Sequence, residues 1–268
     1  GRTITWSEWF IYAAPFSIIM SIVLFFIMIN LIKPETDVIE GGKEVISKQL
    51  AELGPLKGKE IRLIIISLSL LFLWATEGSL HPLDTTTVTI VAIAILLAPK
   101  IGVYSWSEVE RLIPWGTIIV FAVGIALGSV LLNTNGAQWL SDTVFGTLGL
   151  DSMPLLATIA IVTLFNILIH LGFASATSLA SALIPVFIVL ASTITANGDQ
   201  QIGFVLIQQF VISFGFLLPI SAPQNMLAYG TGAFTTRDFL KSGIPLTIIA
   251  YILIIIFSAT YWQWIGLL

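Results

Sequence analysis

The stretch HLGFASATSLASALIP, residues 170–185, places small hydroxyl side chains in the middle of one of the most apolar parts of the chain. Two apolar runs, 157–172 and 178–192, flank its central Ser-Ala-Thr. Each run of about 15 residues forms roughly 22 Å of helix, less than the ~30 Å of hydrocarbon in a bilayer. The stretch therefore predicts a helical hairpin that bends inside a membrane.

The composition of the whole chain supports a membrane setting. Hydrophobic residues make up 57% of the 268 residues, charged residues make up 10%, and the mean hydropathy is +1.00. Apolar runs at 9–32, 113–132 and 244–262 are long enough to cross a bilayer, and helices satisfy their own backbone groups in lipid. We therefore expect an all-α polytopic membrane protein. The absence of cysteine excludes disulfides and thiolate metal sites.

The basic residues predict the orientation of the chain. Six of the eleven Lys and Arg residues lie between Lys33 and Arg62, so the positive-inside rule makes the amphipathic connector at 34–61 cytoplasmic. Arg237 and Lys241 come after the next long uncharged region, and they stay on the cytoplasmic side only if residues 154–190 make an even number of passes. Two arms that are too short to cross favour a re-entrant hairpin.

A second interruption follows in LPISAPQNMLAYGTG, residues 218–232, where prolines break an apolar run. The helix that resumes after it, like the second arm of the hairpin, begins with free N–H groups and a partial positive charge suited to a carboxylate. No Lys or Arg lies between Arg111 and Arg237. An anion held there must depend on helix dipoles, hydroxyl groups, or a cation or proton bound with it.

Three motifs resemble a known family: the tip SAT (175–177), the break SAPQN (221–225) followed by YGTG, and the run WGTIIVFAVGIALGSVLLNTNGAQWL (115–140). They are similar to the second half of the divalent anion:sodium symporters, the INDY-type di- and tricarboxylate transporters, in the same order over essentially the whole chain. The resemblance implies one inverted-repeat half with a re-entrant hairpin and a broken transmembrane helix. It also implies a portion of a transporter near twice this length, which forms a homodimer and moves its transport unit as an elevator.

This resemblance divides the chain into four parts. Residues 1–33 are expected to be the transmembrane helix that ends the first repeat, 34–61 the connector, 62–133 the scaffold transmembrane helices and 134–268 the transport unit. The transport unit is expected to contain the re-entrant hairpin (154–192), the broken helix (203–236) and the last helix (243–262).

The resemblance also implies the site residues. Substrate is expected at the tip and at the break, on Ser175, Ala176, Thr177, Ala222, Pro223 and Asn225. Backbone carbonyls of Ala174 and Ser221 are expected to form a weaker cation site, and His170, apart from the resemblance, is a candidate proton site. Ala176 stands where the family has an Asn that contributes to both substrate and sodium, and Ala222 stands where its second motif has a Thr. Leu171 stands where the family has a hydroxyl residue that helps to bind the cation. An Ala side chain cannot coordinate sodium, so the chain resembles the sodium-independent dicarboxylate exchangers of the family more closely.

The expected function is secondary active transport of C4/C5 dicarboxylates (succinate, malate, fumarate, 2-oxoglutarate) by exchange in the plasma or inner membrane. Two alternatives stay open: a sodium-coupled di- or tricarboxylate symporter, and a membrane-embedded interaction subunit without transport. The chain carries no HExxH, GxSxG or phosphate-loop motif, so we expect no enzyme, no catalytic residues, no metal site and no cofactor other than sodium. The basic region is short and mixed with acids, which excludes a nucleic-acid partner.

Several features also have purely structural explanations. Hydroxyl residues in membrane helices often serve close packing, and Gly124 and Gly128 form a GxxxG pattern that predicts helix packing. His170 is either a hydrogen-bonded structural residue or a protonatable counter-charge for substrate. Glu77 and Asp84 fall near a membrane face. Solvation at the interface explains these two acids more simply than a role in a proton relay does.

Overall fold

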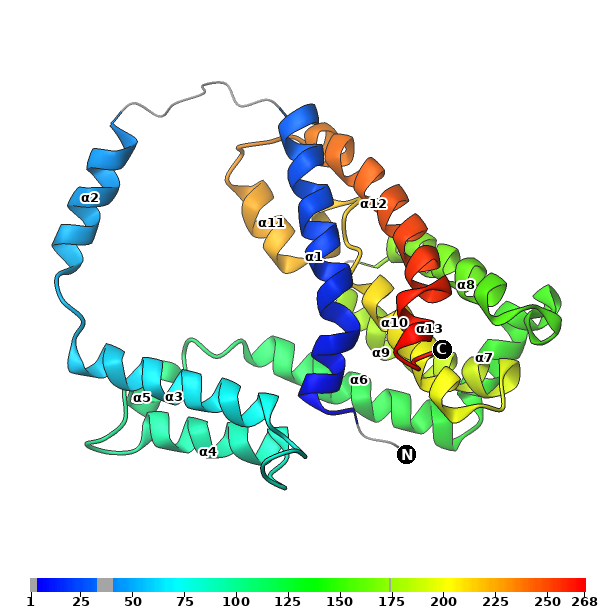
Figure 1. The fold of residues 1–268 in the computed structure, drawn as a ribbon, viewed down its shortest axis with the longest axis horizontal. Coiled ribbons are helices and arrows are strands. Elements are labelled where there is room, and N and C mark those ends of the chain that lie inside the picture. Colours follow the sequence, from blue (N-terminus) through cyan, green and yellow to red (C-terminus); the bar gives the residue numbers. More distant parts are fainter. Residues whose placement is uncertain (1–3, 33–40, 174) are drawn as a thin grey trace. The chain divides into compact units, whose positions relative to one another are not determined.

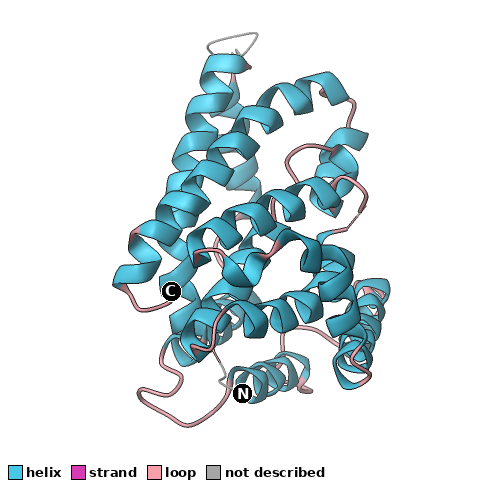
Figure 2. Ribbon diagram, turned by 90° about the vertical axis from the view of Figure 1, so that its right-hand side faces the viewer, coloured by secondary structure: helices cyan, strands magenta, loops and turns pink. Residues whose placement is uncertain are grey.

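The computed structural model describes residues 4–32, 41–173 and 175–268. Regular secondary structure in these residues is helical, apart from an isolated bridge between Glu77 and His81. Figure 2 shows the helices in cyan with their connecting loops. The expected all-α class is confirmed.

The chain divides into two compact units, one from residues 1–14 and 34–114 and the other from 15–33 and 115–268. Their boundary near residue 114 differs from the expected division at 133 between scaffold and transport unit. The reason is that α6 (Trp115–Asn133) packs along α9 (Ala176–Ile194) inside the second unit. The functional division into scaffold and transport parts stays a prediction.

The first unit contains α2 (Gly42–Leu53), α3 (Gly58–Ala75), α4 (Thr85–Leu97) and α5 (Trp106–Val109). The turn between α3 and α4 is held by side chains that cap the second helix. Asp84 accepts hydrogen bonds from the Thr87 amide (2.9 Å) and hydroxyl (2.6 Å), which hold the pKa of Asp84 below its usual value. Glu77 accepts from the Thr85 hydroxyl at 2.5 Å. These contacts give both acids a structural role in starting α4.

Helix α2 lies within the expected connector, and it is amphipathic. Ile46, Leu50 and Leu53 fall on one face of the helix and are 67%, 68% and 73% exposed. Part of the connector, residues 34–40, lies outside the described residues. The position of α2 on the inner membrane surface stays a prediction.

The second unit is built from apolar helices, which are labelled in Figure 1, and from short connecting turns. Besides α6 and α9 it contains α1 from residue 15 onward (α1 is Trp6–Leu31), α7 (Gly136–Phe145), α8 (Leu155–His170), α10 (Gly198–Ile212), α11 (Pro223–Gly230), α12 (Thr236–Ala259), α13 (Tyr261–Trp264), and the 3-10 turns η1 (Gly146–Leu148), η2 (Leu150–Ser152) and η3 (Pro219–Ser221).

Helix α9 lies at the centre of this unit, in contact with α6, α7 and α10. A Cβ atom on Gly124 would overlap the Ser181 hydroxyl, and one on Gly128 would come within 2.9 Å of Pro185 Cγ. The two glycines therefore let α6 approach α9 closely, which confirms the packing interpretation of the GxxxG pattern.

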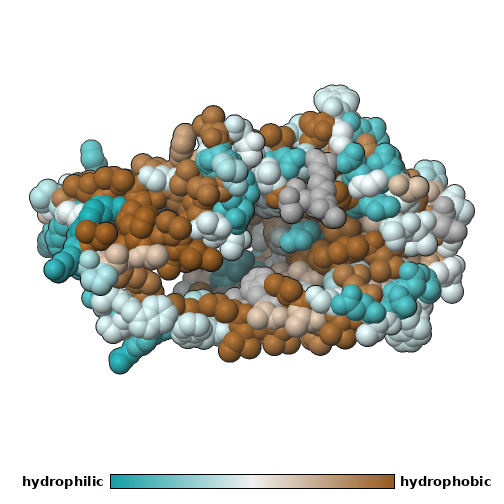
Figure 3. Space-filling model, turned by 90° about the horizontal axis from the view of Figure 1, so that it is seen from below, coloured by the Kyte–Doolittle hydropathy of each residue, from teal (hydrophilic) through white to brown (hydrophobic). Residues whose placement is uncertain are grey.

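Three helices in the described residues are long and apolar enough to span a membrane: Trp6–Leu31, Ala176–Ile194 and Thr236–Trp264. Many of their apolar side chains are exposed, and broad hydrophobic surface is visible in Figure 3. Lipid solvates such surfaces at no cost, so the exposed residues agree with a membrane location.

The two expected arms correspond to α8, which ends at His170, and α9, which begins at Ala176. The second arm contains 19 residues, more than the expected run from 178 to 192. At about 28 Å, that helix is nearly long enough to cross, so length alone does not separate a re-entrant arm from a span. The re-entrant depth of the hairpin and the inverted repeat stay predictions.

The last long helix starts earlier than the expected residue 243. Thr235 and Asp238 form a capping box, in which the Thr235 hydroxyl accepts from the Asp238 amide at 3.3 Å and the Asp238 carboxylate accepts from the Thr235 amide at 3.0 Å. This cap lets α12 begin at Thr236, so that Arg237 and Lys241 belong to its first turns. The expected broken helix at 203–236 corresponds to α10 and α11, with the irregular segment and η3 between them.

Gly243 provides a test of how the interruption is packed. A Cβ atom there would overlap the carbonyl oxygen of Phe216, in the segment that follows α10. We expect Gly243→Ala to destabilise the protein by about 1–3 kcal/mol, since neither backbone can yield easily. Thermal unfolding in detergent measures this, with Gly116→Ala as the control because a Cβ on Gly116 meets nothing within 4 Å. Equal melting of the two variants would contradict the packing.

Candidate functional site

One face of α8 carries buried polar side chains in an otherwise apolar helix. Thr163, Asn166 and His170 follow each other at helical spacing, and they are 0%, 0% and 3% exposed. Gln208 of α10 is also fully buried and joins two of them. Its Nε2 donates to the Thr163 hydroxyl at 3.1 Å, and Asn166 Nδ2 donates to the Gln208 backbone carbonyl at 3.0 Å. The network fixes the first arm of the hairpin to α10.

The network leaves one acceptor unused. Asn166 Nδ2 also reaches Gln208 Oε1 at 3.3 Å, and because both of its partners are acceptors the orientation of the Asn166 amide is fixed. Asn166 Oδ1 is buried and has no hydrogen-bond partner among the described residues. A buried unsatisfied oxygen costs free energy and indicates a missing donor.

His170 lies in the last turn of α8, where the hairpin begins to bend. The backbone of Ser221 lies beside its ring, and within the described part of the chain neither ring nitrogen has a hydrogen-bond partner. The structure thus brings together two of the expected site residues, one from the hairpin and one from the interruption.

The interruption after α10 is closed by its own side chains. Asn225 Nδ2 donates to the Gly215 carbonyl at 2.8 Å, and a Cβ on Gly215 would come within 3.2 Å of Ser221 Cβ. Ser221 and Ala222 are buried, and Ala222 is extended directly before α11. Asn225 therefore has a structural role, and its role in substrate binding stays a prediction.

The tip of the hairpin forms the start of α9. Ser175 is the N-cap residue, with its hydroxyl accepting from the Ser178 amide at 3.4 Å, and Ala176 and Thr177 form the first turn. These three residues are half-buried. Ala174 and the side chain of Pro223 lie outside what the structure describes. Ser178 and Ser181 face α6 and line an apolar groove of about 510 Å³.

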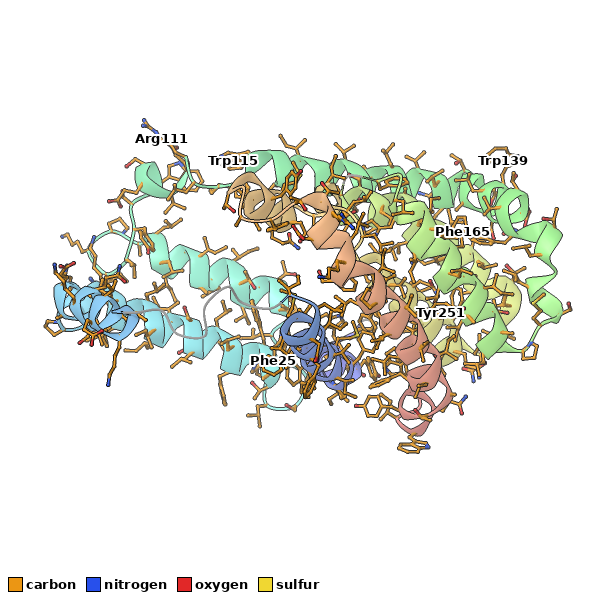
Figure 4. All side chains as sticks on the ribbon, turned by 90° about the horizontal axis from the view of Figure 1, so that it is seen from above. Phe25, Arg111, Trp115, Trp139, Phe165 and Tyr251 are labelled. Atoms are coloured by element: carbon orange, nitrogen blue, oxygen red, sulfur yellow. The ribbon has the colours of Figure 1, made fainter. Side chains whose placement is uncertain are left out.

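Sequence reasoning missed Thr163, Asn166 and Gln208. The available signal was the spacing of Thr163, Asn166 and His170, which places polar groups on one face of a very apolar helix. The partner on α10 could not be found this way, because Gln208 and Gln209 are adjacent in sequence and only one of them turns inward. A further contact ties α12 to α8, where the Tyr251 hydroxyl donates to the Ala160 carbonyl at 3.2 Å (Tyr251 is labelled in Figure 4).

Long apolar helices, with buried polar groups gathered where the helices bend or break, define a polytopic all-helical membrane protein. All 268 residues match the family model described as the sodium:sulfate symporter transmembrane region. The chain belongs to this family, that of the divalent anion:sodium symporters which its motifs resemble.

Individual relatives extend the comparison. A protein of Cupriavidus necator H16 described as a membrane protein is 49% identical over 267 residues, which are 99% of this chain and 52% of that protein. The sodium-dependent dicarboxylate transporter SdcS of Staphylococcus saprophyticus is 25% identical, covering 96% of this chain and 51% of the relative. The L-tartrate/succinate antiporter of Escherichia coli K12 is 27% identical, and the match covers 95% of this chain and 51% of the relative. The chain spans about half the length of these relatives.

Gln208 and Gln209 form a matched pair for testing the buried network. We expect Gln208→Leu to destabilise the protein by about 1–3 kcal/mol, because it leaves the buried Thr163 hydroxyl without its partner and removes one acceptor of Asn166. Gln209→Leu, on the exposed side of the same helix, should leave the melting temperature nearly unchanged. The measurement is the melting temperature of the two variants in detergent. A lower melting temperature in Gln209→Leu alone would show that Gln208 is not the residue that stabilises the buried network.

Proposed function

We propose that this chain is part of a secondary active transporter that exchanges C4/C5 dicarboxylates such as succinate, malate, fumarate or 2-oxoglutarate. The observation that carries the proposal is that His170, at the end of α8, and Ser221, in the interruption, are both buried and lie near each other. Helix α9 begins six residues after the first of these and α11 begins two residues after the second. Two helix N-termini therefore start close to one point in the buried polar region.

Such an arrangement suits a carboxylate. Free N–H groups and the positive ends of two helix dipoles attract an anion without any Lys or Arg, and the chain has neither between Arg111 and Arg237. In this proposal Ser175 and Thr177 donate hydroxyl hydrogen bonds to one carboxylate, together with amides of the first turn of α9. The Ala222–Asn225 turn lies on the other side of that carboxylate.

Family membership and the printed names of relatives support transport of dicarboxylates, but they point to two ways of coupling. One relative is named a sodium-dependent dicarboxylate transporter and another an L-tartrate/succinate antiporter. We favour exchange, because Ala176, Ala222 and Leu171 supply no side-chain oxygen at positions where sodium would need one. A sodium-coupled symporter that uses backbone carbonyls of Ala174 and Ser221 is the second candidate.

The remaining parts of the proposal follow the family pattern. The hairpin and the interrupted helix move together as an elevator, carried by a homodimer in the cell membrane, with the connector at 34–61 on the cytoplasmic side. The short arm α8, with 16 residues, supports a hairpin that stops inside the bilayer.

The proposal is tested with the full-length protein in proteoliposomes, by following the uptake of labelled succinate. Exchange predicts uptake that requires unlabelled dicarboxylate inside the vesicles and is indifferent to sodium. Uptake into empty vesicles that is driven by an inward sodium gradient would favour the symporter instead. If neither condition gives uptake of any C4/C5 dicarboxylate, the proposed substrate class is wrong.

Single substitutions at the tip separate transport from packing. We expect Ser175→Ala and Thr177→Ala each to lower succinate exchange at least tenfold with normal expression, since each removes a donor to the substrate. Ser192→Ala is the control, because that hydroxyl lies at the exposed far end of α9 and bonds only the Val189 carbonyl, at 2.7 Å. Unchanged exchange in both tip variants would favour a subunit whose hydroxyls serve helix packing.

A further inference from the structure

His170 has an unusual position in the charge pattern of the chain. Between residues 112 and 236 it is the only side chain that can take a positive charge; the other ionisable groups there are acids and a phenol, namely Asp142, Asp151, Asp199 and Tyr229. A dicarboxylate brings two negative charges into a region of low dielectric, where an uncompensated charge is costly. Any positive side chain contributed by this segment must therefore be this imidazole.

Two features beside the buried His170 ring would stabilise a positive charge on it once an anion is bound. The imidazole lies in the last turn of α8, where the negative end of the helix dipole stabilises a cation. Asn166 Oδ1, one turn earlier on the same face, is a buried acceptor without a donor in the described part of the chain. A protonated ring has two N–H donors, whereas the neutral ring has one. A protonated ring can therefore donate toward Asn166 Oδ1 and still keep a second N–H for another acceptor.

The elements packed around α8 add no competing charge at this point. Neither α9 nor the segment from Ser213 to Ala222 contains a titratable residue. Asp199 is in the first turn of α10, and Tyr251 of α12 is bonded to the Ala160 carbonyl, ten residues before His170 (α8 and α12 run side by side in Figure 1). The charged residues of α12 are Arg237, Asp238 and Lys241, all in its first two turns, and both basic residues are exposed. The titratable residue of α11 is Tyr229.

We propose that His170 binds one proton when the dicarboxylate binds, and so supplies the positive charge that the neighbouring segment otherwise lacks. This inference rests on the proposed function and names the counter-charge of its substrate site. The imidazolium donates one N–H toward Asn166 Oδ1 and turns its other N–H toward the interruption at Ser221. A purely structural histidine, or one that holds a buried water, would bind no additional proton when substrate arrives.

Proton uptake on binding is measurable directly with the full-length protein. Succinate at matched pH is added to weakly buffered, detergent-solubilised protein that contains a pH indicator dye, between pH 7 and pH 9. Both carboxylates of succinate are already ionised in this range, so the substrate itself takes up no proton. We expect uptake of about one proton per bound succinate, and an affinity that falls by up to tenfold for each pH unit, as one linked proton requires.

Two histidine variants make the assignment specific, because the chain contains only two histidines. His170→Gln keeps hydrogen-bonding capacity but cannot be protonated; it should bind succinate more weakly, without proton uptake and with an affinity independent of pH. His170→Asn is the second replacement if Gln does not fold. His81→Gln is the control and should behave like the wild-type protein, since His81 belongs to the α3–α4 turn and contacts the Leu73 carbonyl at 2.9 Å.

The outcomes separate this inference from the proposed function. Binding of succinate by the wild-type protein without proton uptake would overturn the role of His170 and leave dicarboxylate transport standing. Proton uptake that persists in both His170 variants would likewise overturn the role of His170 and leave dicarboxylate transport standing. If the wild-type protein neither binds nor exchanges succinate, malate, fumarate or 2-oxoglutarate, the proposed function is wrong, and this inference falls with it.

Discussion

The structure of the second unit depends on satisfying polar groups inside an apolar protein. Gln208 of α10 forms hydrogen bonds with Thr163 and Asn166 of α8. Asn225 donates a hydrogen bond to the Gly215 carbonyl, just after the end of α10. In a membrane no water replaces a lost partner, so each of these bonds limits how the helices can be arranged. The hairpin arm is consequently held by α10, and the interruption that follows α10 is held by a bond between its own residues and α11.

Close backbone packing makes the interruption possible. A segment without helical hydrogen bonds must be covered by protein, and Gly243 of α12 allows the Phe216 carbonyl to approach where any side chain would block it. Gly124 and Gly128 do the same for α6 against α9. The small residues thus lie where irregular backbone, or a polar face, would otherwise be exposed to lipid. Their distribution is a consequence of the polar groups that they help to enclose.

The sequence predicted the class, the family and the two interruptions well, because apolar run length and proline position act locally. It predicted less well where a helix ends, since the capping box at Thr235 and Asp238 starts α12 seven residues before the apolar run suggested. It also could not reveal that Gln208 joins Asn166, because that contact depends on the rotation of α10 against α8. Of the expected site residues, His170 and Ser221 come together in the structure, whereas the substrate roles of Ser175, Thr177 and Asn225 depend on a ligand.

The loss of side-chain oxygens at Ala176 and Ala222 and the presence of His170 bear on the same electrostatic problem. A symporter returns its carrier empty, so the positive charge that accompanies the substrate must leave with it, as a sodium ion does. In the proposed exchanger, the proton that His170 binds with each dicarboxylate is released in the same way when that dicarboxylate leaves. A protonatable side chain in the carrier is therefore compatible with exchange, and it removes the need for the oxygen ligands that a bound sodium ion requires. On this argument, Ala176 and Ala222 need no side-chain oxygen because the protonated His170 compensates the charge of the substrate in place of sodium.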